Sequence, residues 1–344
     1  MSELLSRGVF RLMSCPSIEG AAAIVGAKEG EGPLGALFDQ VHEDSYLGQD
    51  TWEKAESQLQ TQAVQTALKK SGHKPDEIGL LFAGDLLNQC IGSSYGLREL
   101  QIPFYGLYGA CSTMGEGLGL AALFTDSGLI RRAAAVTSSH FCSAERQFRY
   151  PLEYGGVRPP SAQWTVTGAG AVVVGPSGKP PYLKGVATGM IQDLGVTDIN
   201  NMGAAMAPAA ADTIRRYLEA TQTQPSDYDR IITGDLGAVG SELLLDLLGR
   251  EQIDLSAQHD DCGLLIFNRE EQDVHAGGSG CGCSASVLCA HILNEIQSGR
   301  WNEVLFIPTG ALMSTVSVQQ GESIPGIAHL VHLSSKRWPQ PEQE

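Results

Sequence analysis

An internal repeat constrains the fold of this chain more than any other feature. Residues 74–86 (KPDEIGLLFAGDL) recur in outline as residues 224–236 (QPSDYDRIITGDL), with the proline and the Gly-Asp-Leu triplet at identical spacing. Each copy follows a run with helical spacing, at 52–71 and 209–220, and predicts a proline-started turn, a buried strand and a Gly-Asp turn. The fold therefore contains the same helix-turn-strand unit twice.

A second correspondence follows each copy of the repeat. A helix predicted to begin at Cys111 precedes a strand over 133–137, and a helix predicted to begin at Cys283 precedes a strand over 304–307. Alternating helices and strands in two similar halves predict a duplicated α/β architecture, whose mixed, largely parallel sheets are covered by helices on both faces. We expect the two halves to span residues 1–180 and 181–344.

Composition excludes several classes of function. The chain has 344 residues, of which 42% are hydrophobic and 18% are charged, so it can bury a large core. Its formal net charge of -16 argues against a nucleic-acid partner and against adsorption to anionic membranes, because both need concentrated Lys and Arg. The sequence shows neither an apolar run of about 18 residues nor a signal-peptide pattern, so we expect the protein to stay where it is made.

The 8 cysteines do not indicate a disulfide framework, because such frameworks belong to small secreted domains. We therefore expect reduced thiols in a cytosol-like compartment. Cys281 and Cys283 resemble half of a metal site, but zinc sites usually separate paired cysteines by about two to four residues and need a second pair or histidines. We predict no resident metal ion and no cofactor.

Cys111 follows a short apolar stretch and the turn-forming residues Gly109 and Ala110, at the predicted start of a helix. Unsatisfied backbone N–H groups and the helix dipole at such a position lower the pKa of a thiol and attract anions. This geometry suits a nucleophile and an anion-binding pocket equally well. A buried structural cysteine is the third interpretation, because free cysteines are among the most buried residues.

The order of these motifs resembles that of the thiolase-like condensing enzymes, especially β-ketoacyl-acyl carrier protein synthase III. The motifs are residues 75–78 (PDEI) before a buried strand, 109–112 (GACS) at a helix start, and 167–175 (TGAGAVVVG). The resemblance extends from about residue 22 to residue 333. It implies a thiolase-like duplicated αβαβα five-layer fold, a homodimer, and a cysteine at the N-terminus of a buried helix.

The sequence departs from the condensing enzymes at the two positions that assist their cysteine. Those enzymes place a histidine in a His-Gln-Ala-Asn stretch and an asparagine in a Gly-Asn-Thr-Ser stretch, and these donors stabilise negative charge during the reaction. The matching stretches here are residues 234–237 (GDLG) and 280–283 (GCGC). Losing such a donor typically costs about 2.7 to 4 kcal/mol. We therefore expect a pocket with a new use in place of efficient condensation.

Within this superfamily the chain resembles the stage V sporulation protein AD family of spore-forming bacteria. The resemblance is close at residues 26–35 (GAKEGEGPLG), 84–89 (GDLLNQ), 105–114 (YGLYGACSTM) and 138–151 (SSHFCSAERQFRYP). It implies a non-catalytic protein that binds dipicolinic acid (pyridine-2,6-dicarboxylate), free or as its calcium chelate, and supports its uptake into the forespore. It also implies peripheral association with the spore inner membrane, where other stage V sporulation A proteins supply the channel.

A planar dianion needs groups that bind two carboxylates and a slot for an aromatic ring. Residues 131–158 hold five arginines and two glutamates, in a chain whose acids outnumber its bases 39 to 23. We therefore expect the ligand to lie between the cysteine turn and this basic stretch, with Phe141 and Phe148 as further candidates for the ring slot. The predicted contacts are Cys111, Ser112, Ser139, His140, Arg146, Arg149, Tyr150, Asp235 and Cys281.

Several of these contacts have structural alternatives. Arg146 and Arg149 can instead pair with nearby glutamates at the surface. His140 can be a satisfied residue at a strand end. Asp235 is either a turn residue, like Asp85 in the first copy of the repeat, or a contact for the calcium ion of a chelate.

Two other functions fit the same sequence. Cys111 can carry out acyl transfer if its thiol pKa is lowered, with His140 or His275 as an unusual base. The chain can also be a scaffold whose pocket is vestigial and whose dimer and partner surfaces alone matter.

Overall fold

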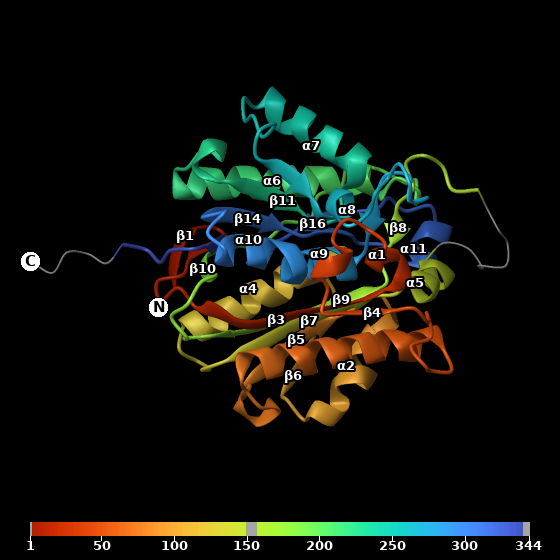
Figure 1. Cartoon of the computed structure of the whole chain (residues 1–344). Helices are drawn as coiled ribbons and strands as arrows, with labels where there is room; N and C mark the ends of the chain where they lie inside the picture. The colour runs from red at the N-terminus through yellow and green to blue at the C-terminus, as the bar shows by residue number, and fades with distance from the viewer. Residues whose placement is uncertain (1, 149–156, 340–344) are drawn as a thin grey trace, which may run out of the picture.

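The computed structural model describes residues 2–148 and 157–339. The main strands of these residues form two sheets of five strands each, one in each half of the molecule (Figure 1). The first half contains, in spatial order, β6 (Phe104–Gly106), β5 (Leu80–Gly84), β7 (Ala133–Ser139), β9 (Gly168–Gly175) and β3 (Ser17–Gly26). The second half contains β12 (His259–Asp261), β11 (Arg230–Thr233), β14 (Glu303–Ile307), β17 (Leu330–Ser334) and β10 (Tyr182–Ala187). One antiparallel pair, Tyr182 with Ser17, joins the two sheets.

Strand pairing is identical in the two halves. β5 lies parallel to β6 and β7, and β9 lies antiparallel to β7 and β3. In the same way, β11 lies parallel to β12 and β14, and β17 lies antiparallel to β14 and β10. The duplicated architecture predicted from the repeat is therefore confirmed.

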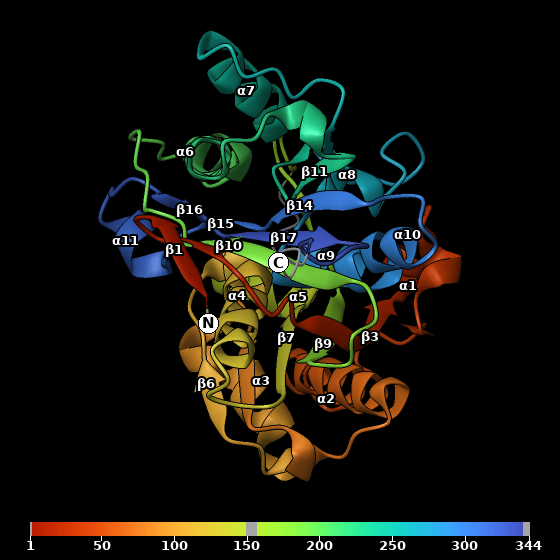
Figure 2. The ribbon, with the colours of Figure 1, turned by 90° about the vertical axis from the view of Figure 1, so that its left-hand side faces the viewer.

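Helices form the outer layers of the molecule (Figures 1 and 2). α2 (Trp52–Ser71) and α3 (Ile91–Leu97) cover the outer face of the first sheet. α6 (Met202–Thr221) and α7 (Gly237–Arg250) lie beyond the second sheet. Each outer layer begins with a 20-residue helix capped by a side-chain oxygen, that of Thr51 in α2 and Asn201 in α6.

A middle helical layer separates the two sheets and completes the predicted αβαβα order (Figure 2). α4 (Thr113–Asp126) follows the cysteine turn, and α9 (Cys281–Val287) continues through a π-helical turn, Leu288–Ile292, into α10 (Leu293–Gln297). Apolar side chains of both sheets and of these helices belong to one buried cluster. The middle helices therefore bury apolar surface on both sides, as expected for helices that are apolar all round.

Shorter elements complete the fold and include the segments that border the site described below. Two pairs of short strands lie outside the main sheets, parallel β8 with β13 and antiparallel β15 with β16. The bounds are β1 (Glu3–Ser6), β2 (Val9–Arg11), α1 (Ala27–Gly30), β4 (Gln40–His42), α5 (Phe141–Phe148), β8 (Trp164–Thr165), α8 (Cys262–Leu265), β13 (Gly278–Ser279), β15 (Thr309–Ala311), α11 (Thr315–Gln319) and β16 (Gly326–Ala328). Within the described residues, no helix has the length and apolar character needed to cross a membrane.

Both copies of the repeat fold as the sequence predicts. Each copy contains a short 3-10 helix, Pro75–Glu77 in the first and Pro225–Asp227 in the second. In both helices the carboxylate of the last residue accepts a hydrogen bond from the backbone N–H of the residue before the helix, with an N–O distance of 2.8 Å. The buried strands β5 and β11 follow, and each leads to a buried aspartate, Asp85 or Asp235. These aspartates occupy equivalent positions in the two halves.

Candidate functional site

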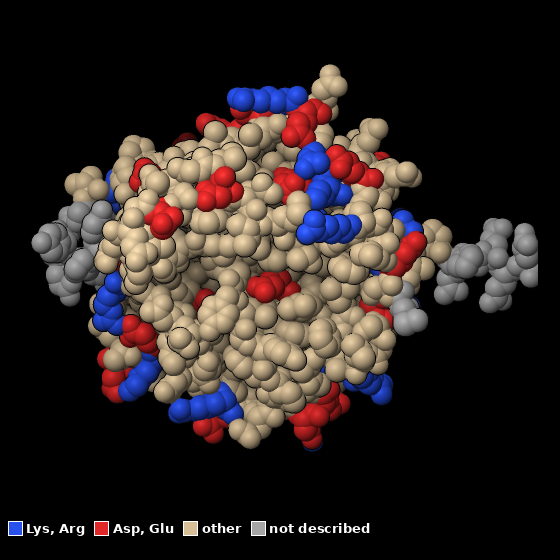
Figure 3. All heavy atoms as spheres, turned by 180° about the vertical axis from the view of Figure 1, so that it is seen from behind, with Lys and Arg blue, Asp and Glu red and all other residues tan. Residues whose placement is uncertain are grey.

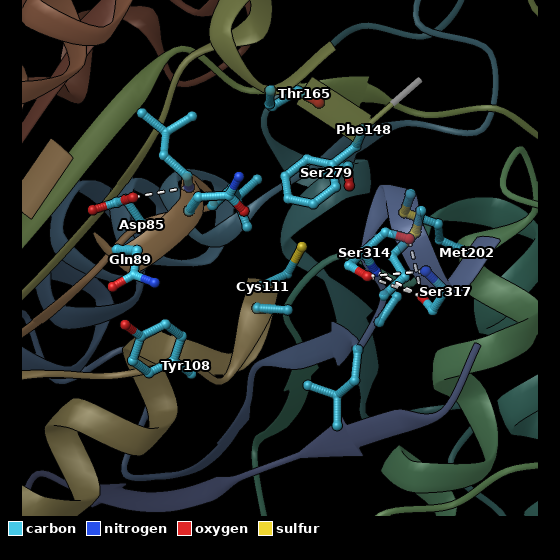
Figure 4. Close-up of a pocket in the computed structure, with 18 residues that line it drawn as sticks. Asp85, Gln89, Tyr108, Cys111, Phe148, Thr165, Met202, Ser279, Ser314 and Ser317 are labelled. Atoms are coloured by element: carbon cyan, nitrogen blue, oxygen red, sulfur yellow. Dashed lines mark hydrogen bonds between the residues drawn. The ribbon is translucent and has the colours of Figure 1, made fainter. Parts of the chain in front are cut away.

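A pocket of about 380 Å³ opens at Cys111, between segments of the two halves (Figure 4). The loop after β5, residues 85–89, borders one side together with Tyr108. Ser314 and Ser317, at the start of α11, border the opposite side. The pocket therefore draws its lining from both copies of the duplicated unit.

The polar lining of the pocket is almost entirely uncharged. Its amide and hydroxyl side chains are Asn88, Gln89, Tyr108, Thr165, Ser279, Ser314 and Ser317. Asp85 is the acidic member of the lining, and no Lys, Arg or His lines the pocket among residues 2–148 and 157–339. Phe148, Met202 and several aliphatic side chains supply the apolar part. The described walls thus offer hydrogen bonds and apolar contact, without a positive charge.

Cys111 lies in the 3-10 turn Ala110–Ser112, directly before α4, and its sulfur points into the pocket (Figure 4). Ala110 holds the left-handed φ of 48° that few non-glycine residues adopt. Gly310 of β15 packs so closely on this turn that a Cβ atom there would lie 2.4 Å from the carbonyl oxygen of Gly109. Contact with the second half therefore fixes the turn that presents the thiol.

The electrostatics of Cys111 differ from the sequence-based prediction. Burial, followed by the neighbouring Asp235 carboxylate, raises the thiol pKa well above its usual value. The thiol therefore lies beside a carboxylate that opposes its ionisation. The predicted lowering of the pKa at a helix start is therefore wrong, because burial and an adjacent negative charge outweigh the helix dipole. Cys111 is a protonated thiol at neutral pH.

Asp235 lies in the stretch, residues 234–237, that matches the histidine-bearing stretch of the condensing enzymes. Thr309 Oγ1 donates to its Oδ1 at 2.7 Å, and the Gly280 N–H donates to its Oδ2 at 2.8 Å. Burial raises the pKa of Asp235 to about 6. The carboxylate lies behind Cys111 and does not line the pocket, although it was predicted as a ligand contact.

Ser112 and Ser139 were also predicted as ligand contacts, but the structure buries both away from the pocket. Ser112 Oγ donates to Gly109 O at 2.6 Å, within the cysteine turn. Ser139 Oγ donates to Val166 O at 2.7 Å and so links β7 to the neighbouring β8 segment. Both hydroxyls therefore satisfy backbone carbonyls of the fold.

His140 and Cys281 are likewise held by the protein. The Nε2 atom of His140 lies 2.7 Å from Ser45 O, and its Nδ1 accepts from Cys142 N at 3.2 Å. Burial lowers the pKa of His140, which favours the neutral ring. The Cys281 thiol donates to Ser138 O at 2.9 Å. Neither side chain lines the pocket, so the structure corrects both placements.

The described arginines of the basic stretch do not line the pocket. Arg146 forms an ion pair with Glu53 on α2 and does not line the pocket. Arg132 and Arg158 likewise pair with acidic side chains from distant parts of the chain. The surface alternative is therefore the correct one for Arg146, although its partner is Glu53 and not a neighbouring glutamate of the same stretch.

Aromatic side chains near the site occupy two different environments. Phe148, at the end of α5, lines the pocket, as Ser279 does (Figure 4). Phe141 instead stacks on Trp164 outside it, with ring centroids 3.8 Å apart. Two predicted contacts, Arg149 and Tyr150, lie outside the residues that the structure describes.

Comparison with known proteins decides the family. The model of a family described as stage V sporulation protein AD matches residues 6–334. The chain belongs to this family. It is 47% identical over 312 residues to stage V sporulation protein AD of Bacillus subtilis strain 168, and the matched region covers 91% of this chain and 92% of that relative.

Solved structures of low sequence identity show the fold. The 3-oxoacyl-(acyl-carrier-protein) synthase III of Aquifex aeolicus matches with a TM-score of 0.54 and 13% identity, over 93% of this chain and 99% of that one. Cerulenin-bound OleA of Xanthomonas campestris matches with a TM-score of 0.58 and 16% identity, over 93% of this chain and 96% of that one. The thiolase-like fold is therefore confirmed for this member of the stage V sporulation protein AD family.

Sequence analysis of this stage V sporulation protein AD family member missed most of the pocket lining. Asp85 was noted only as the repeat partner of Asp235, yet it borders the pocket. Gln89 and Cys90 have consecutive left-handed φ values of 62° and 49°, a strained arrangement that is typical of functional loops. The repeat and the conspicuous 84–89 motif were the signals that pointed to this loop.

Proposed function

We propose that the pocket at Cys111 binds dipicolinic acid or its calcium chelate, and that the protein supports uptake of this ligand into the forespore without catalysing a reaction. Membership of the stage V sporulation protein AD family makes it a sporulation protein. The resemblance on which the sequence analysis drew supplies the ligand. The observation that carries the proposal is a pocket of about 380 Å³ at the cysteine of a condensing-enzyme fold. The sequence stretches that match the histidine and asparagine stretches of those enzymes carry neither residue.

The lining of the pocket supports a planar aromatic dicarboxylate. Such a ligand needs apolar contact for its ring and hydrogen-bond donors at two opposite poles. Phe148 offers a ring face, while Gln89 and Tyr108 lie across the pocket from Ser314 and Ser317 (Figure 4). Amide and hydroxyl groups therefore stand on two sides of the space that the ring would fill.

The surroundings of Cys111 favour binding over acyl transfer. A thiolate is the nucleophilic form of cysteine, and both burial and Asp235 oppose its formation. The two histidines considered as unusual bases are engaged elsewhere, because His140 contacts Ser45 O and His275 lies 3.1 Å from an aspartate oxygen. Neither ring lines the pocket.

Titration calorimetry with dipicolinate, with and without calcium, tests the proposal. Benzoate and acetyl-coenzyme A serve as controls for a single carboxylate and for a condensing-enzyme substrate. We expect selective binding of dipicolinate or its chelate. Binding of acetyl-coenzyme A without binding of dipicolinate would contradict the proposal and favour acyl transfer.

A matched pair of variants on α11 locates the binding site. Ser317→Trp places a large ring where Ser317 lines the pocket, so we expect it to abolish dipicolinate binding. Val316→Trp changes the preceding residue, which is 59% exposed and does not line the pocket, and should leave binding intact. Equal affinities for the two variants would move the site away from this pocket.

We also propose a homodimer formed through the edge strand β6. All three of its residues are exposed, and it pairs only with β5 within the described chain. Tyr95, Phe104, Tyr105 and Tyr108 expose between 39% and 67% of their surface near this edge. Figure 3, which views the molecule from behind, shows a broad area with few charged side chains. Unpaired edges that carry apolar residues tend to pair with another strand.

Light scattering of the purified protein tests this dimer. We expect a mass of twice 36.5 kDa for the parent chain. Phe104→Glu should shift the mass toward the monomer, because it places a charge on the exposed edge. A parent protein that remains monomeric at tens of micromolar would contradict the proposed dimer.

We further propose that the protein associates peripherally with the forespore or spore inner membrane through other stage V sporulation A proteins. The family resemblance implies that those proteins supply the channel, and no helix in the described residues is suited to span a bilayer. Fractionation of sporulating cells is the test. We expect the protein in the membrane fraction when these partners are present and its release when they are deleted.

A further inference from the structure

A pair of buried carboxyl groups adjoins the pocket on the side of the first half. Asp85 follows β5, lines the pocket and is 5% exposed. Glu56 on α2 lies deeper and is 0% exposed. Within the described residues neither acid forms an ion pair with Lys, Arg or His. Carboxylates buried without a cation are costly, so this pair needs another source of stabilisation.

A continuous chain of hydrogen bonds connects the two acids. Ser93 Oγ donates to Asp85 Oδ2 at 2.6 Å, and Ser138 Oγ donates to Glu56 Oε1 at 3.0 Å. Gln60 Nε2 bridges the two hydroxyls, at 2.9 Å from Ser93 Oγ and 2.8 Å from Ser138 Oγ. Gln60 Oε1 is buried and has no hydrogen-bond partner in the described structure. The cluster thus contains more hydrogen-bond acceptor atoms than donated hydrogens. One of the two carboxyl groups can therefore carry an additional proton.

Among residues 2–148 and 157–339, the neighbours of this carboxyl pair add no free positive charge. Several titratable groups, from the elements packed against the pair, face the pair or its immediate contacts. These groups are Glu53, Cys90, Tyr108, Glu116 and Cys281. The cation that approaches this region, Arg146, is already paired with Glu53. Protons therefore provide the charge compensation that the described side chains do not.

Protonation of the pair is accessible near neutral pH. Burial, reinforced by Asp85, raises the pKa of Glu56 to about 8. Burial also raises the pKa of Asp85. The pair consequently changes its proton content within the pH range of a cell, and a charged ligand that enters the adjoining pocket will shift that content.

We propose that the Asp85–Glu56 pair makes the site selective for the charge of its ligand: free dipicolinate binds together with a proton, whereas the neutral calcium chelate binds without one. This inference rests on the proposed function. A dianion in a pocket without a described cation repels an ionised Asp85 strongly, because the surroundings have a low dielectric constant. Protonation of the pair removes that repulsion. Calcium bound to the dianion removes it equally well.

Calorimetry in two buffers of different ionisation enthalpy tests the coupling. PIPES and Tris at pH 7.5, on chelator-treated protein, report the number of protons exchanged on binding. We expect net proton uptake with free dipicolinate and none with the preformed calcium chelate. The affinity for free dipicolinate should fall by up to about ten-fold per pH unit between pH 7 and 9, as linkage to one proton requires.

Two matched variants assign the proton. Glu56→Gln should abolish proton uptake and flatten the pH dependence, because a neutral amide replaces the titrating group. Glu29→Gln is the control, since Glu29 is equally buried, has a pKa of about 7 and does not line the pocket, and it should leave proton uptake unchanged. Should Glu56→Gln fail to fold, Asp85→Asn tests the same pair.

The outcomes separate this coupling from the proposed function. Binding of free dipicolinate without proton exchange in either buffer would overturn the coupling and leave the proposed function standing. Proton uptake that survives in both Glu56→Gln and Asp85→Asn would overturn the assignment to this pair. Absence of binding by both dipicolinate and its chelate would overturn the proposed function and this inference together.

Discussion

The two aspartates of the repeat occupy equivalent positions yet have different surroundings. Asp85 borders the pocket and accepts hydrogen bonds from Leu87 N at 2.9 Å and Ser93 N at 2.7 Å. Asp235 is enclosed beneath Cys111 and Thr309. The same Gly-Asp turn therefore has two different surroundings in the two halves: one copy borders the pocket and the other lies beside the thiol of Cys111.

The chain that follows each aspartate explains this difference. After Asp85, a loop with two left-handed residues at Gln89 and Cys90 precedes α3, which leaves space for the pocket. After Asp235, α7 begins almost at once at Gly237, whose φ is 63°. The duplicated fold thus gives the two aspartates the same backbone position. The segment that follows each aspartate determines which groups surround its side chain.

The largest expected loss of stability comes from replacing either aspartate of the repeat with alanine. Asp235→Ala leaves a buried threonine hydroxyl and a buried N–H without an acceptor, and each such group costs about 1 to 3 kcal/mol, so we expect a loss of about 3 kcal/mol or more. Asp85→Ala should cost about 1 to 2 kcal/mol, because pocket water can replace the carboxylate. Urea unfolding followed by circular dichroism measures both. A larger loss for Asp85→Ala would reverse the comparison.

The contact between β15 and the cysteine turn gives the next largest effect. A methyl group at Gly310 meets the Gly109 carbonyl oxygen, so Gly310→Ala should cost about 1 to 3 kcal/mol and weaken ligand binding as the turn moves. Gly249→Ala is the control, because its Cβ meets nothing within 4 Å, and it should be neutral or stabilising by up to about 1 kcal/mol. Equal melting temperatures for the two variants would show that the turn is not held by this contact.

The pH dependence of stability separates the two sides of the site further. Glu56 has a pKa raised to about 8, so the folded state binds more protons than the unfolded state, and the free energy of unfolding falls as pH rises toward 8. The buried histidines with lowered pKa values oppose this trend near pH 6.5, where the unfolded histidines are half protonated, and this opposition fades as the pH rises toward 8. The slope is about 1.4 kcal/mol per pH unit for each proton.

Melting curves between pH 6.5 and 8 measure this slope in the parent chain and in Glu56→Gln. We expect the variant to show the shallower slope. The remaining slope reports the other buried acids, of which Asp261 and Glu29 each have a pKa of about 7. Stability that rises with pH across this window would contradict the assignment of raised pKa values.

The smallest expected effect concerns the reactivity of Cys111. Iodoacetamide should modify Cys111 more slowly at pH 8 than it modifies a free thiol, because burial and Asp235 keep the thiol protonated. Asp235→Asn removes the neighbouring negative charge and should accelerate the modification several-fold. Asp85→Asn should change it less. Peptide mass spectrometry follows Cys111 separately from the other cysteines, and identical rates in all three proteins would refute the role of Asp235.

The sequence was sufficient for the architecture because the repeat encodes it locally. Proline, apolar spacing and the Gly-Asp turn specify each unit, and their recurrence specifies the duplication. The contacts of Cys111 were not encoded in this way. The helix start was correctly predicted, but the pKa of the thiol depends on burial and on Asp235, which is distant in sequence and close only in the folded chain.

The predicted arginine contacts illustrate a second limit. A cluster of arginines in sequence indicates local positive charge, but each side chain is directed by its own position. Arg146 reaches back to Glu53 on α2, a residue 93 positions earlier, and no periodicity reveals such a pairing. The polar lining was missed for the same reason, since Ser279 in β13 and Tyr108 in the segment after β6 reach the pocket from distant parts of the chain.

The shared middle layer has a consequence for how this chain can be divided. Phe82 of the first sheet and Phe306 of the second belong to one buried cluster with Met114 and Val287 of the middle helices. Each sheet therefore obtains part of its inner covering from the opposite half. A gene fragment that encodes one half alone would expose this apolar face to water, so we expect such a fragment to aggregate.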